Sequence, residues 1–152
     1  MDDELGVESP SELDWFAEES AAMEAFIEER TEGYVVGSRR GLLDEMAAFA
    51  EGSGEPSVLV VTGEPGSGKS ALLGRFYLHY VETHPNEIVI PHFVGASQGS
   101  TSIRLTLRRL RHELAEAAGT EDQIPEDLPG MAVCGGRQRT VRGLLAVACP
   151  GV

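Results

Sequence analysis

The chain has 152 residues, enough to bury one ordinary hydrophobic core, so a single domain is expected. Its 12 basic and 25 acidic residues give a net charge of -13, which repels nucleic-acid phosphates and anionic membrane surfaces. No apolar run reaches the roughly 18 residues that a membrane-spanning helix needs, and the acidic residues at positions 2–4 are unlike the basic start of a signal peptide. We therefore expect a cytoplasmic protein that binds neither nucleic acid nor membrane.

The amino-terminal third divides into two parts. Residues 1–19 hold eight of the acidic side chains, and this composition is typical of a solvated, disordered segment. Residues 20–51 show apolar side chains at helical spacing, which predicts two amphipathic helices that precede the core. The first apolar stripe is Ala22, Met23, Phe26 and Ile27, and the second is Leu42, Leu43, Met46 and Phe49.

Residues 63–70 match the phosphate-binding pattern G-x-x-x-x-G-K-[ST] in full. Its glycines let successive backbone N–H groups face one phosphate, and Lys69, the only lysine, adds a positive charge. The hydroxyl of Ser70 is the predicted Mg²⁺ ligand. We therefore predict that this loop binds a nucleoside triphosphate, ATP or GTP, together with Mg²⁺. The predicted binding residues are Gly63, Glu64, Pro65, Gly66, Ser67, Gly68, Lys69, Ser70 and Ala71.

Both flanks of this loop agree with the pattern. Residues 57–62 form a short β-branched run, as expected of a parallel strand buried on both faces. Downstream, apolar residues from Ala71 to Tyr80 recur at helical spacing, and a helix there would aim its positive end at the phosphates. Two alternatives remain: a glycine-rich turn without a ligand, and an NAD or FAD fingerprint over 66–71 with Glu87 as the ribose-binding acid.

The next segments continue the alternation of strand and helix. Residues 87–95 predict a second strand, in which Pro91 indicates an edge or a bulge. A helix is expected to begin near Thr101 or Ser102, either of which can cap it. On that helix we expect the core-facing residues Ile103, Leu107, Leu110 and Leu114, and a basic stripe of Arg104, Arg108 and Arg111. The predicted fold class is therefore α/β, a three-layer P-loop NTPase core with a parallel sheet over residues 52–118.

Residues 119–152 differ from the rest of the chain. No acidic residue occurs from Leu128 onward, and the one apolar run, at 143–150, ends in Cys-Pro. We therefore expect an atypical tail and a core that is incomplete on its carboxyl-terminal side. The histidines show no i,i+4 pair and no cysteine neighbour, so no zinc site is indicated. Cys134 and Cys149 are expected to be structural or incidental.

Three segments together resemble a known family. Residues 34–39, 63–70 and 92–110 are similar to the NACHT branch of the STAND NTPases, of the nephrocystin-3-like kind that carries tetratricopeptide or WD40 repeats. The resemblance covers about residues 20–116. It implies that Val35, Val36 and Gly37 border the base, that Arg39 or Arg40 faces the nucleotide, and that Lys69 is the catalytic cation. Such proteins also need an acid after a further core strand, the Walker B acid, and this chain has none.

These expectations lead to one main function and two alternatives. The main prediction is an ATP-binding or GTP-binding switch module for assembly or signalling, with weak or absent hydrolysis because the water-orienting acid is missing. The first alternative is a non-catalytic protein-interaction fragment that uses sheet edges left open by missing strands. The second is a small P-loop kinase, in which the arginines at 104–111 clamp an acceptor phosphate.

Overall fold

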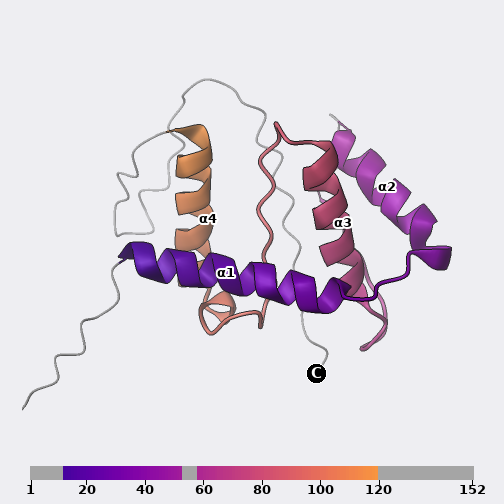
Figure 1. Cartoon of the computed structure of the whole chain (residues 1–152), viewed down its shortest axis with the longest axis horizontal. Coiled ribbons are helices and arrows are strands. Elements are labelled where there is room, and N and C mark those ends of the chain that lie inside the picture. The colour runs from indigo at the N-terminus through magenta and orange to yellow at the C-terminus, as the bar shows by residue number, and fades with distance from the viewer. Residues whose placement is uncertain (1–11, 53–57, 120–152) are drawn as a thin grey trace, which may run out of the picture.

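The computed structural model describes residues 12–52 and 58–119, which are helical apart from their connections. Figure 1 shows these elements in chain order from indigo to orange. The elements are α1 (Glu12–Thr31), η1 (Gly37–Arg39), α2 (Arg40–Glu51), α3 (Lys69–Thr83), η2 (Gly99–Thr101) and α4 (Ile103–Ala118). Within the described ranges no helix is long and apolar enough to cross a membrane.

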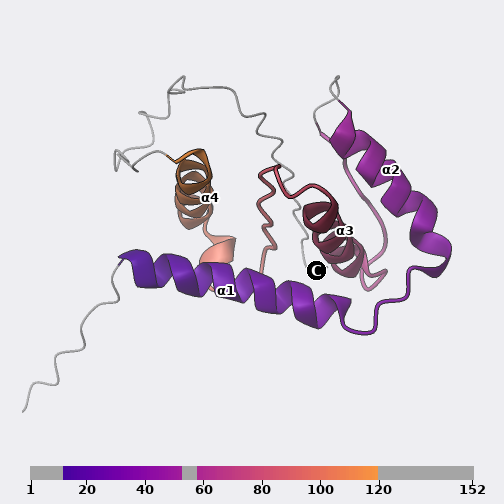
Figure 2. The same ribbon diagram turned by 45° about the horizontal axis from the view of Figure 1, so that its top comes forward.

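Helix α1 ties the other elements together. It runs across both α3 and α4, while α2 packs against α3 (Figures 1 and 2). Its first turns contact α4 through aromatic side chains: the rings of Phe16 and His112 stack with centroids 3.9 Å apart, and the Arg108 guanidinium lies 5.4 Å from the Trp15 ring. The predicted boundary after residue 19 therefore falls inside a continuous, packed helix.

The first core cluster joins α1 to α3 and to the extended segment before η2. Its buried members are Met23, Ile27 and Phe93, and the Phe26 ring lies 5.2 Å from the Phe93 ring. The predicted stripe on α1 is confirmed, because Met23 and Ile27 are the residues that it buries. Close approach of the two helices requires Gly74, where an added Cβ would lie 3.1 Å from Thr31 Cγ2.

The second core cluster lies between α2 and α3. Its buried members are Met46, Leu72, Phe76 and Tyr80. Val61 and Val89, from the two extended segments that flank α3 in the sequence, pack against the same cluster. Leu73 contacts both clusters and so connects them. The helices expected around residues 42–49 and 71–80 are thus confirmed by α2 and α3.

The predicted parallel sheet is wrong for the part of the chain that the structure describes. Residues 58–62 and 88–93 are extended, but no β-strand occurs in the described ranges. Val58 and Val60 are 70% and 74% exposed, whereas the sequence predicted a strand covered on both faces. Local composition favours an extended backbone, but a sheet also requires a partner strand at hydrogen-bonding distance. The α/β fold class is corrected to an arrangement of helices with extended connections.

Helix α4 begins as predicted but buries a different face. Ser102 is its N-cap, and the hydroxyl oxygen accepts a hydrogen bond from the Leu105 N–H at 3.5 Å. Ile103 and Leu114, expected in the core, are exposed, and Ile103 is 79% exposed. Arg109, 2% exposed, is buried in their place. The predictions for the tail, including Cys134, Cys149 and the apolar run at 143–150, fall outside the described residues.

Candidate functional site

The glycine-rich loop at residues 63–70 forms a tight turn directly before α3. Gly66 and Gly68 have φ angles of +75° and +80°, a region that glycine enters at no steric cost. Gly68 is the N-cap residue of α3, and the Ser67 N–H donates to the Glu64 carbonyl at 3.1 Å. The glycine spacing therefore has a local structural reason, because two of these positions need left-handed backbone.

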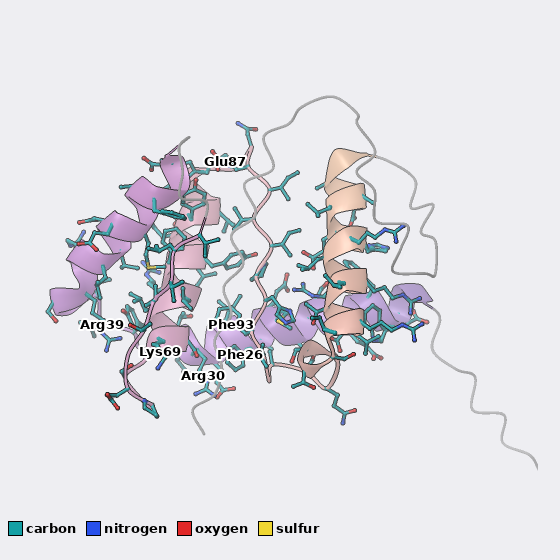
Figure 3. All side chains as sticks on the ribbon, turned by 180° about the vertical axis from the view of Figure 1, so that it is seen from behind. Phe26, Arg30, Arg39, Lys69, Glu87 and Phe93 are labelled. Atoms are coloured by element: carbon teal, nitrogen blue, oxygen red, sulfur yellow. The ribbon has the colours of Figure 1, made fainter. Side chains whose placement is uncertain are left out.

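Two cations bind this loop through its own carbonyl oxygens. Lys69 Nζ donates to the carbonyls of Gly63 and Glu64 at 2.8 and 2.9 Å. Arg39 donates to the Ser67 carbonyl at 2.5 Å and to the Gly68 carbonyl at 3.4 Å. Figure 3 shows both side chains at the loop end of α3. Their hydrogen bonds tie both side chains to the loop backbone.

The predicted loop residues lie together in the turn before α3 and at the start of that helix, and the predicted base-bordering residues Val35, Val36 and Gly37 lie in the connection between α1 and α2. Glu64 and Pro65 are exposed, and Ser70 and Ala71 are half-buried at the start of α3. Val35 is exposed, so the segment 34–39 reaches the loop through Arg39. Arg39, and not Arg40, is therefore the arginine that contacts the loop.

A buried polar cluster lies on the other side of the molecule, centred on Arg109. Its guanidinium donates to Glu113 Oε1 and to the Pro91 carbonyl, and lies 3.4 Å from His92 Nδ1. Because arginine can only donate, His92 Nδ1 is an acceptor and Nε2 carries the proton. Nε2 then donates to the Ser100 carbonyl at 3.1 Å. These bonds fix the extended segment against α4.

The burial of this cluster changes its titration. Burial lowers the pKa of His92, and the charge of Arg109 lowers it further, so the imidazole is held neutral. Burial raises the pKa of Glu113, and Arg109 opposes that rise. Sequence reasoning missed Arg109, because it lies in a basic stretch with exposed and half-buried arginines. The i,i+4 spacing of Arg109 and Glu113 was the one available signal.

A surface of a different kind is formed by the apolar run 58–61 (Val-Leu-Val-Val). Among the described residues no backbone hydrogen bond joins residues 58–62 to another element. The side chains of Val58, Leu59 and Val60 are exposed, whereas Val61 packs on the second core cluster. The run therefore contacts the core through Val61, while its three other apolar residues are exposed.

Two carboxylates lie away from the loop: Glu51 is the last residue of α2, from whose end the chain enters the run (Figure 2), and Glu87 follows α3. Tyr80, in the cluster that Val61 contacts, donates its hydroxyl to Glu87 Oε2 at 2.8 Å. The His84 ring stacks on Tyr80 with centroids 4.0 Å apart, and its Nε2 lies 3.5 Å from Glu51 Oε1. Figure 3 shows Glu87 at the opposite end of α3 from Lys69 and Arg39. We call Glu51 and Glu87 the acidic pair.

Comparison with known proteins gives short matches. The chain is 33% identical over 67 residues to a TPR repeat-containing protein of Dictyostelium discoideum, covering 44% of this chain and 4% of that protein. It is 38% identical over 79 residues to human nephrocystin-3, covering 47% and 6%. It is 34% identical over 62 residues to mouse tetratricopeptide repeat protein 41, covering 41% and 5%. The matched region is about a twentieth of each relative. No family model and no solved structure matches the chain.

These findings correct the predicted family and function. The assignment to a NACHT-type P-loop NTPase is wrong, because the described residues lack the sheet of such a core and two of the relatives are named for TPR repeats. The predicted role as a nucleotide-binding switch is overturned with it, and the protein-interaction alternative agrees better with a helical chain. Binding of ATP or GTP with Mg²⁺ by residues 63–71 stays a separate prediction.

Proposed function

We propose that this chain is a helical protein-interaction module, and that the apolar run 58–61 takes an extended segment of a partner protein. The proposal rests on one observation: the run belongs to no helix, its side chains at 58–60 are exposed, and its backbone makes no hydrogen bond to the other described residues. Exposed apolar residues scattered singly need no explanation, but three in succession on a backbone that pairs with no other described segment form a contiguous surface.

The backbone of the run, which is unpaired within residues 12–52 and 58–119, determines how a partner can bind. A row of free N–H and C=O groups is a template for another strand, and peptides recognised in this way gain affinity from main-chain hydrogen bonds. Val58 and Val60 alternate with Leu59 and Val61, so each face of the run has the spacing of strand side chains. Contact of Val61 with the core cluster holds the run in place before binding, which lowers the entropy lost on association.

The relatives support an interaction role. Two of them are named for TPR repeats, and arrays of such repeats stack helix pairs into extended binding surfaces. The chain spans about a twentieth of each relative, so its partner is proposed from its own surface. A net charge of -13 disfavours nucleic acid as that partner. We propose a cytoplasmic location, as expected from the sequence.

The test uses a neutral peptide, acetyl-Thr-Val-Thr-Val-Thr-Val-Thr-amide, titrated into the ¹⁵N-labelled full chain. We expect chemical-shift changes and slowed amide exchange concentrated at residues 58–62. Val60→Lys should weaken binding at least tenfold, because it places a charge within the paired surface. Val35→Lys is the matched control, since Val35 is a similarly exposed valine outside the run.

Two results would contradict the proposal. One is the absence of binding by a chain whose spectrum shows that it is folded. The other is binding that Val35→Lys weakens as much as Val60→Lys does, which would indicate nonspecific adhesion of an apolar peptide.

A further inference from the structure

We infer that the partner segment carries basic side chains at one end, and that this end lies beside Glu51 and Glu87. The inference rests on the proposed function and adds the chemistry of the partner. Its basis is the unequal charge at the two ends of the apolar run.

The acidic pair is held at one end by the second core cluster. Tyr80 belongs to that cluster and donates to Glu87, while His84 stacks on Tyr80 and approaches Glu51. The Tyr80 hydroxyl is a neutral donor, so the negative charge of Glu87 is not cancelled. Both carboxylates are partly accessible, and the Glu51 side chain is 57% exposed. A cation arriving at this end thus meets two acids whose positions are restrained.

The opposite end has the other sign. Lys69 and Arg39 bind the loop that follows the run, and Glu64 is the one acid of that loop. Their hydrogen bonds to neutral carbonyls leave both positive charges in place. A segment with basic side chains at both ends is therefore repelled at the loop, whereas a segment basic at one end matches the surface.

The charge of the whole chain makes a second copy a poorer occupant. Each copy carries a net charge of -13, so two copies repel each other before their runs can pair. A separate protein segment with a basic end is attracted by the same field. We therefore assign the run to a partner of this composition.

The experiment compares the neutral peptide with two versions that carry two arginines, one at the amino end and one at the carboxyl end. Both orders are included so that either strand direction is covered. Since an exposed ion pair contributes up to a factor of about five in affinity, we expect one arginine peptide to bind about tenfold more tightly than the neutral peptide. At about 1 M salt, where the Debye length is about 3 Å, this preference should be lost.

A matched pair of double variants separates the local acids from the net charge. Glu51→Gln with Glu87→Gln should abolish the preference for arginine, and glutamine at 87 can still accept the Tyr80 hydrogen bond. Asp44→Asn with Glu45→Gln removes the same charge from exposed positions of α2 and should leave the preference unchanged.

Three results would overturn the inference. Equal binding of the neutral and arginine peptides would refute it while leaving the proposed function intact. If both double variants lose the preference for arginine equally, the preference comes from the net charge of the chain. A chain that sediments as a dimer, and as a monomer after Val60→Lys, would assign the run to a second copy. Failure of every peptide to bind contradicts the proposed function itself.

Discussion

Removal of the buried guanidinium of Arg109 should cost a large part of the stability of this chain. The change Arg109→Met keeps most of the side-chain length but removes the donors to Glu113 and to the Pro91 carbonyl. Breaking a buried ion pair by removing one partner costs about 3 to 5 kcal/mol. The Glu113 side chain is 19% exposed and so keeps some hydration, which places the expected loss near the lower end, about 3 kcal/mol.

The double variant Arg109→Met with Glu113→Gln tests this reasoning more sharply than the single change. It removes both charges, and replacement of a whole buried pair by less polar groups is often close to neutral. The Pro91 carbonyl still loses its donor, which costs roughly 1 to 3 kcal/mol. We therefore expect the double variant to be more stable than Arg109→Met by about 1 kcal/mol or more.

Urea unfolding followed by the fluorescence of Trp15 measures these differences. Trp15 is the only tryptophan, and its ring lies under Arg108 at the contact of α1 with α4. With a urea dependence of about 2 kcal/mol per M, a loss of 3 kcal/mol lowers the midpoint by about 1.5 M. Arg104→Met, at an exposed position of the same helix, is the control and should change the stability by less than about 0.5 kcal/mol. The reasoning is refuted if Arg109→Met costs less than about 1 kcal/mol, or if the double variant is the less stable.

Three further predictions concern other parts of the chain. The pKa of His92 in the folded chain lies below its ordinary 6.5, so the unfolded state binds the proton first and the stability should fall as the pH drops below about 6.5. Urea unfolding measured from pH 8 to 5 should show that stability depends less on pH in His92→Gln. An equal pH dependence in the two proteins would contradict this prediction. Lys69→Met removes two hydrogen bonds to loop carbonyls and should lower the stability by about 1 kcal/mol, with Arg75→Met as control. Calorimetry with ATP and Mg²⁺ on the same proteins tests the predicted ligand: the unchanged chain should bind it, and Lys69→Met should not. Gly74→Ala should cost about 1 to 3 kcal/mol by thermal unfolding, because its Cβ meets Thr31, and Thr31→Ser should recover part of the loss; no recovery would place the strain elsewhere.

The sequence by itself determined the local structure of this chain. Helices α2 and α3 lie where apolar spacing predicted them, because a stripe at 3.6-residue spacing needs only one face to bury. Ser102 caps α4 as expected, and Gly66 and Gly68 take the left-handed backbone that their loop requires. Each of these features depends on residues within a few positions of one another, so a single sequence contains the needed information.

Only the tertiary structure decided which segments pair and which side chains are buried. The β-branched run 58–61 reads as a buried strand, but pairing depends on a partner strand from another part of the chain, and among the described residues none is present. Arg109 lies in a stretch with the composition of a solvated helix face, and its burial follows from the Pro91 carbonyl and His92, which the fold brings from 18 and 17 residues away. Both outcomes depend on contacts between distant segments, whose energies local propensity does not contain.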